Sequence, residues 1–80
     1  MSTIDQLREL ILQLERKNIT AEMLTPDALF FDDLGFDSLN MTELLVLAET
    51  TFNINVELKE LHDLFTLAQA AQFIDRKIAK

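Results

Sequence analysis

Ser38 is the residue of this sequence whose type and position best suit chemistry. It lies at the predicted start of an amphipathic helix, three residues after Gly35, the only glycine of the chain. Because glycine adopts positive φ at little cost, Gly35 can turn the chain sharply and present Asp37 and Ser38. Either residue can cap the helix by accepting a hydrogen bond from a first-turn N–H group, worth about 1 kcal/mol. Alternatively, Ser38 is a modification site, because the positive end of a helix dipole favours an attached phosphate.

The other reactive side chains do not complete a catalytic or metal site. A serine nucleophile needs a base, and His62, the only histidine, is predicted on another helix, with no glycine-framed nucleophile elbow around the serine. An EF-hand loop starting at Asp33 would have glycine at its third position, serine at its sixth and leucine at its twelfth, which breaks the calcium-binding pattern. The sequence has no cysteine and no zinc ligand set. We therefore expect no enzymatic activity and no metal, with His62 at the surface or at a helix end.

The composition predicts one small domain over residues 1–80. Apolar residues make up 49% of the chain and cysteine is absent, so aliphatic packing must supply the core without disulfides. No apolar run approaches the roughly 18 residues of a membrane span, and no signal or basic transit segment precedes the first predicted helix. These features favour a soluble, cytoplasmic protein, and the start at Met1 favours a free-standing one.

The net charge of −7 is concentrated in the middle of the chain. Residues 18–58 contain no Lys or Arg and eight acidic residues: Glu22, Asp27, Asp32, Asp33, Asp37, Glu43, Glu49 and Glu57. Such a field repels nucleic acid and anionic lipid and attracts basic partners over a distance. Acidic surfaces also serve solubility. Because the acids cluster around Ser38, we interpret them as a means of steering partner proteins.

Hydrophobic spacing predicts an all-α fold with three longer helices and one short helix. Capping boxes mark two helix starts, at Thr3 with Gln6 and at Thr66 with Gln69. The expected helices run from about Ile4 to Lys17, from Ser38 to Thr51 or Phe52, from Leu58 to Asp63, and from Thr66 to the C-terminal cations. No strand is expected.

The connection between the first two helices is long, and its apolar residues must anchor it. Proline suits a first helical position, so we expect a short turn over Pro26–Phe30. A structureless loop of this length is uncommon in a compact domain. We therefore expect the apolar side chains of this segment to pin it to the bundle: Leu29, Phe30, Phe31 and Leu34.

The helix that starts at Ser38 has two faces of different character. One face carries apolar residues at inward-facing spacing: Met41, Leu45, Ala48 and Phe52. The other mixes apolar side chains with carboxylates, among them Leu39, Glu43, Val46 and Glu49. Their position beside Ser38 indicates a small docking surface for partner proteins.

The residues around Ser38 resemble those of the acyl carrier protein family. Asp37-Ser38-Leu39 is preceded by Asp32-Asp33-Leu34-Gly35 and followed by Glu43-Leu44 and Phe52, and the resemblance extends from the first helix to the last. It implies an acyl carrier domain over residues 1–80, folded as a four-helix bundle of acyl carrier protein type. It also implies that Ser38 carries 4′-phosphopantetheine through a phosphodiester, with Asp37 beside the attachment point. The partner contacts would be Leu39, Glu43, Val46 and Glu49.

The resemblance implies a carrier and not an enzyme. A phosphopantetheinyl transferase would load Ser38 from coenzyme A, and the terminal thiol would hold acyl or ketide intermediates as thioesters, which supplies the reactivity that a cysteine-free chain lacks. The monomer would then meet ketosynthase- or acyltransferase-type enzymes with basic docking patches. The bundle could also open around an acyl chain lined by Phe30, Leu45, Leu61 and Ala71, although core packing explains these four residues equally well.

Some residues depart from carriers of primary fatty acid synthesis. Those carriers usually have an acid, a valine and an acidic run where this chain has Asn40, Thr42 and Thr50-Thr51. The second helix therefore carries less negative charge, and we favour polyketide or other specialised acyl biosynthesis over fatty acid biosynthesis. The alternative from another class is a non-prosthetic acidic helical adaptor, which binds basic partners through the same helix.

Overall fold

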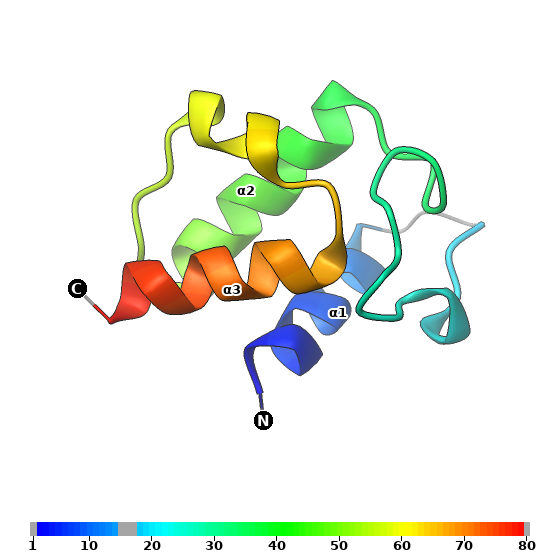
Figure 1. The fold of residues 1–80 in the computed structure, drawn as a ribbon, viewed down its shortest axis with the longest axis horizontal. Helices are drawn as coiled ribbons and strands as arrows, with labels where there is room; N and C mark the ends of the chain where they lie inside the picture. Colours follow the sequence, from blue (N-terminus) through cyan, green and yellow to red (C-terminus); the bar gives the residue numbers. More distant parts are fainter. Residues whose placement is uncertain (1, 15–17, 80) are drawn as a thin grey trace.

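The fold is all-α in a computed structural model that describes residues 2–14 and 18–79. Its elements in order are α1 (Thr3–Gln13), the 3₁₀ turn η1 (Ala21–Met23), α2 (Ser38–Phe52), the 3₁₀ helix η2 (Leu58–Asp63) and α3 (Leu67–Ile78). The α1 helix packs against both α2 and α3, and Figure 1 shows η2 beside α2 and the connection 18–37 near the start of α3. The predicted bundle of three longer helices and one short helix is confirmed. No helix in the described part of the chain is both long and apolar enough to cross a bilayer.

The core lies where the three α-helices and the connection 18–37 meet, and its side chains are apolar. Phe30 is completely buried, and its ring centroid lies 5.6 Å from that of Phe36. In residues 2–14 and 18–79, no polar or charged side chain is buried. The buried core residues are Leu7, Leu10, Ile11, Ile19, Leu24, Ala28, Phe30, Leu34, Phe36, Met41, Leu44, Leu45, Ala48, Leu64, Leu67, Ala70, Ala71 and Ile74.

The α1 helix begins one residue earlier than expected. Ser2 is the N-cap, and its side chain accepts a hydrogen bond from the Asp5 N–H. The prediction of Thr3 as the cap is therefore wrong: Thr3 is the first helical residue, and its hydroxyl donates to the carboxylate of Asp75 on α3. The helix ends at Gln13. The predicted end at Lys17 lies outside the described residues.

The connection 18–37 is held against the start of α3 by the backbone. Leu29 and Thr66 form an isolated antiparallel bridge. Three hydrogen bonds join the two segments, from the N–H of Phe30 to the carbonyl of Phe65 (3.0 Å), from Leu67 to Ala28 (3.1 Å) and from Ala68 to Pro26 (2.9 Å). These bonds satisfy polar backbone groups that the burial of Phe30 removes from water.

The predicted anchors of this connection are confirmed in part. Phe30 and Leu34 are buried, whereas Phe31 is 49% exposed and does not serve as an anchor. The helical turn expected over Pro26–Phe30 is wrong as well. Pro26 and Asp27 form a simple turn closed by a hydrogen bond from the Ala28 N–H to the Thr25 carbonyl, and the 3₁₀ turn of this connection is η1.

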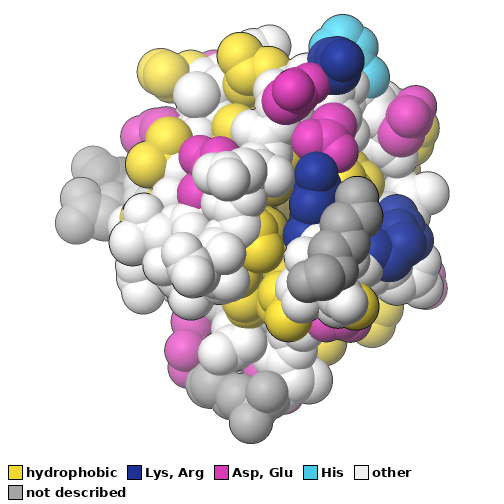
Figure 2. Space-filling model, turned by 90° about the vertical axis from the view of Figure 1, so that its left-hand side faces the viewer, with side chains coloured by type: hydrophobic (Ala, Val, Ile, Leu, Met, Phe, Trp, Pro, Cys, Tyr) yellow, Lys and Arg dark blue, Asp and Glu magenta, His cyan; other side chains and the backbone are white. Residues whose placement is uncertain are grey.

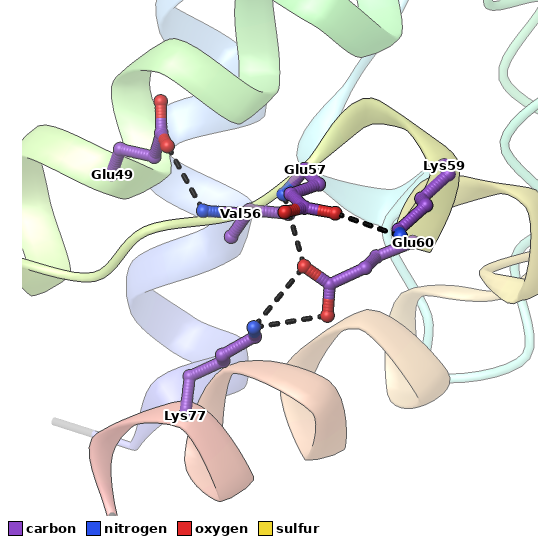
Figure 3. A network of polar contacts seen from close by, with 6 residues as sticks. All are labelled: Glu49, Val56, Glu57, Lys59, Glu60 and Lys77. Atoms are coloured by element: carbon purple, nitrogen blue, oxygen red, sulfur yellow. Dashed lines mark hydrogen bonds and ion pairs between the residues drawn. The ribbon is translucent and has the colours of Figure 1, made fainter.

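A polar network attaches η2 to α3 and the segment 53–57 to α2 (Figure 3). The ammonium of Lys77 lies 2.9 and 3.1 Å from the two carboxylate oxygens of Glu60, and it also lies over the Phe73 ring. Glu60 accepts a further hydrogen bond from the Glu57 N–H. On the other side, the carboxylate of Glu49 accepts from the Val56 N–H at 3.0 Å. Lys77 thus attaches η2 to α3, and Glu49 attaches the segment before η2 to α2.

Gly35 and Asn53 have positive φ, so adding a Cβ atom at the first and removing one at the second tests the cost of this conformation. We expect Gly35→Ala to lower the free energy of unfolding by roughly 1 kcal/mol, because a Cβ atom is disfavoured at φ 68°. Asn53→Gly, at φ 56° in the C-cap of α2, should cause no loss because glycine is preferred there. Urea unfolding followed by circular dichroism measures both. A stable Gly35→Ala variant would contradict this account of the turn.

The predicted capping box of α3 is confirmed and can be tested by removing its hydroxyl. Thr66 accepts from the Gln69 N–H at 3.1 Å, and the Gln69 side chain accepts from the Thr66 N–H at 3.0 Å. Thr66→Ala should therefore lower the free energy of unfolding by about 1 kcal/mol. Thr50→Ala, at an exposed position inside α2, is the matched control and should not destabilise the protein. Equal losses in the two variants would show that the cap contributes nothing.

Candidate modification site at Ser38

Asp37 caps α2, which settles the choice that the sequence left open between Asp37 and Ser38. The Asp37 carboxylate accepts from the Asn40 N–H at 2.9 Å, and the Asn40 side chain accepts from the Asp37 N–H at 3.1 Å. This reciprocal box makes Ser38 the first helical residue. The Ser38 hydroxyl is consequently not needed for the cap.

The surroundings of Ser38 suit the attachment of an anion. Ser38 is exposed, and it begins a helix of 15 residues, the longest described helix of the chain. The positive end of the helix dipole stabilises a negative charge placed in the first turn. The carbonyl of Ser38 itself accepts a hydrogen bond from the Thr42 hydroxyl at 2.9 Å. The serine is therefore held by its backbone while its side chain remains accessible to a modifying enzyme.

The turn before α2 is fixed by contacts from the buried part of the connection. The N–H of Phe36 donates to the carbonyl of Phe30 at 2.9 Å, and both rings are in the core. The Asp33 carboxylate accepts from the Leu29 N–H at 2.8 Å. Between these anchors Gly35 turns the chain with φ 68°. This arrangement sets where Asp37 and Ser38 emerge from the surface.

Three of the four predicted partner contacts share one exposed side of α2. Leu39 and Val46 are 67% and 54% exposed, and Glu43, also exposed, lies between them at helical spacing. Glu49 differs from the other three. It is half-buried, and its carboxylate accepts from the Val56 N–H (Figure 3). The sequence pattern missed this internal role because Val56 lies beyond the end of the helix.

Charge is unevenly distributed over the face that Figure 2 shows. Basic side chains gather on one side of that view, whereas acidic side chains also occur on the other side. The asymmetry follows from the sequence, because Lys59, Arg76 and Lys77 belong to η2 and α3 while residues 18–58 contain no cation. The charged side chains of α2 are accordingly all acidic, Glu43 and Glu49.

A small apolar cavity of about 40 Å³ lies between the helices. Three of the four predicted lining residues, Phe30, Leu45 and Leu61, contribute to it. Ala71 does not line this cavity, although it is buried in the core, and the neighbouring Ala70 does line it. The cavity has room for little more than a single small group, so these residues serve mainly as core packing.

A larger hollow, of about 410 Å³, lies at the surface directly beside Ser38. We call it the Ser38 groove. Its lining residues come from the connection 18–37, from α2, and from η2 with the two residues that follow it: Phe31, Ser38, Met41, Thr42, Leu58, Leu61, His62, Leu64 and Phe65. Sequence reasoning missed Phe31, His62 and Phe65 as neighbours of Ser38, since residues from separate segments share no periodic signal.

Two comparisons with known proteins point to one family. Residues 5–74 match the family described as "Phosphopantetheine attachment site". The chain is also 32% identical over 77 residues to a protein named "Acyl carrier protein" from Solidesulfovibrio magneticus, with 96% of each chain covered. Phosphopantetheine is the cofactor of this family, and an exposed serine at a helix N-terminus, outside the cap, fits its attachment. The chain therefore belongs to the acyl carrier protein family, whose members are carriers and not catalysts.

Proposed function

We propose that this protein carries acyl or ketide intermediates as thioesters on a 4′-phosphopantetheine arm attached to Ser38. The observation that carries this proposal is the position of Ser38. It is exposed, it is the first residue of α2, and the helix is capped by Asp37 instead. It also occupies the serine position of the Asp-Ser-Leu motif. On this proposal residues 1–80 act as one acyl carrier domain, monomeric and cytoplasmic.

Loading requires only that a transferase reach the Ser38 hydroxyl. The serine Oγ forms a bond to the phosphorus of the phosphopantetheine half of coenzyme A, its proton passes to the transferase, and the remaining nucleotide of coenzyme A leaves. The bound group supplies a thiol for thioester formation. The chain contributes the rigid start of α2, which holds Ser38 in a fixed place, and Asp37, which keeps the first turn capped.

Partner recognition is assigned to the exposed side of α2. Leu39 and Val46 supply apolar contact, and Glu43 supplies charge for basic patches on the transferase and on ketosynthase- or acyltransferase-type enzymes. A small interface of this kind forms and dissociates quickly, as a carrier requires. Glu49 has a smaller part in docking, because its carboxylate already accepts the Val56 N–H.

Polyketide or other specialised acyl biosynthesis is the pathway that we favour over fatty acid biosynthesis. Asn40 and Thr50-Thr51 reduce the acidic character of α2 compared with the usual pattern of fatty acid carriers. The cavity of about 40 Å³ between the helices also has no space for a long alkyl chain unless the helices separate. The lower charge of α2 supports partner enzymes other than those of fatty acid synthesis, and the small cavity supports a cargo other than a long saturated acyl chain.

Attachment at Ser38 can be tested by intact mass. After incubation with coenzyme A and a broad-specificity phosphopantetheinyl transferase, we expect the protein to gain one phosphopantetheinyl group. Ser38→Ala should gain none. Ser2 is the only other serine of the chain, so Ser2→Ala is the matched control and should be loaded normally. No gain by the folded parent protein would refute the carrier proposal and favour the acidic adaptor, whose partner binding Ser38→Ala would leave intact.

Docking through α2 predicts a position-dependent effect of charge reversal. Glu43→Lys should lower kcat/KM of the transferase by roughly tenfold at low salt, because it reverses the field next to Ser38. Glu9→Lys makes the same change in net charge at an exposed position of α1 and should have little effect. Steady-state loading at low and high ionic strength measures both, and salt should reduce the difference. Equal effects of the two reversals would mean that net charge alone matters.

A further inference from the structure

A surface hollow of about 530 Å³ lies between η2 and α3. We call it the Arg76 hollow. Its charged and amide side chains come from both helices: Glu60, Asp63, Gln69, Gln72, Arg76 and Lys77. Figure 1 shows the end of α3, which carries Arg76, far from the start of α2, where Ser38 lies. A partner that binds at Arg76 therefore leaves Ser38 uncovered.

Arg76 supplies a positive charge that the fold does not use. It is the one Lys or Arg in residues 2–14 and 18–79 without an ion pair. The others pair with neighbouring carboxylates: Arg8, Lys59 and Lys77. Because Arg76 is exposed, its planar guanidinium keeps its donors available, and their geometry matches a carboxylate.

Two glutamines extend the donors of Arg76 along α3. Gln69, Gln72 and Arg76 are exposed and follow one another at helical spacing, which places them on one face of the helix. The side-chain oxygen of Gln69 already accepts from the N–H groups of Phe65 and Thr66, so its NH₂ group remains for a ligand. This face of α3 therefore presents a row of hydrogen-bond donors that ends in a positive charge.

The carboxylates on the η2 side of the hollow differ in how far they oppose an anion. Glu60 is already engaged, because its oxygens lie 2.9 and 3.1 Å from the Lys77 ammonium and one of them accepts from the Glu57 N–H. Asp63 lines the same hollow, and its carboxylate opposes the binding of an anion. Removal of the Asp63 charge should therefore strengthen binding at Arg76.

We propose that the Arg76 hollow is a docking surface for an acidic segment of a partner protein, with one carboxylate of that segment paired to Arg76. Further carboxylate and carbonyl oxygens of the segment accept from Gln72 and Gln69. Charge complementarity selects this occupant. Residues 18–58 contain no Lys or Arg, so an acidic segment is repelled from α2 and finds its complementary cation on α3.

This surface adds a partner of a different chemistry to the proposed function and does not depend on attachment at Ser38. Basic enzymes are assigned to α2, whereas the Arg76 hollow takes an acidic segment. A protein held at the end of α3 keeps the carrier near an enzyme at a raised effective concentration while the start of α2 stays free. The contact itself is weak and sensitive to salt, because the guanidinium is exposed.

The test uses isotope-labelled protein and a hexaglutamate peptide with both ends capped. In ¹H–¹⁵N correlation spectra at low salt, we expect the peptide to shift the side-chain NH₂ resonances of Gln69 and Gln72 and the Nε–H resonance of Arg76. Added salt should weaken the binding. Absence of these shifts at millimolar peptide, or shifts centred on another face of the molecule, would overturn the proposal.

Three exposed positions separate a local site from an effect of net charge. Arg76→Gln should weaken hexaglutamate binding about fivefold, because it removes the charge and keeps an amide donor. Asp63→Asn should strengthen the binding. Lys59→Gln makes the same change in net charge as Arg76→Gln, on η2 but outside the hollow, and should have little effect. Equal weakening by Arg76→Gln and Lys59→Gln would refute a site at Arg76.

Two further titrations identify the occupant and keep this proposal apart from the carrier function. Citrate that causes the same shifts with the same dependence on the variants would indicate a small-anion site and refute the docking of a protein segment. Ser38→Ala should bind hexaglutamate like the parent protein. Failure of the parent to gain a phosphopantetheinyl group therefore refutes the carrier proposal alone, and failure of the peptide titration refutes the Arg76 hollow alone.

Discussion

The burial of Phe30 is the constraint on which the rest of the structure depends. Its ring is completely enclosed, and its backbone donates to Phe65 at the start of α3 and accepts from Phe36, in the same connection, just before α2. A long connection without regular structure is stable only if its buried backbone groups find partners and its apolar side chains reach the core. Here one residue meets both requirements. The position of Ser38 follows, because the chain leaves Phe36 for α2 only two residues later.

The second physical point is that Asp37 caps α2 and Ser38 does not. The start of a helix leaves N–H groups unpaired, and a neighbouring side chain must accept from them. Asp37 performs this task together with Asn40, so modification of Ser38 removes no stabilising hydrogen bond of the cap. The same helix end then favours an added phosphodiester. Attachment at Ser38, as proposed, therefore leaves the cap of α2 intact.

The short helix η2 both pairs with α3 and lines the surroundings of Ser38. Its Glu60 pairs with Lys77 of α3, and both side chains are largely shielded, which makes this pair less subject to screening than an exposed one. The same η2 carries Leu58, Leu61 and His62 to the Ser38 groove. The short helix that lines the groove is thus the one that this ion pair attaches to α3. No catalytic group is required anywhere in this arrangement, because the reactive thiol belongs to the attached cofactor.

Local patterns in the sequence were enough to predict the helices, the all-α class and the motif around Ser38. Apolar periodicity and capping act over three or four residues, so the α2 bounds, the Thr66 cap and the end at Asn53 could be predicted. Contacts between distant segments could not. Phe31, Phe65 and His62 come together beside Ser38, Glu49 turns to Val56, and Thr3 bonds to Asp75 although it resembles a cap. These features depend on how the packed helices place residues that are far apart in the chain, and no spacing within one helix encodes that placement.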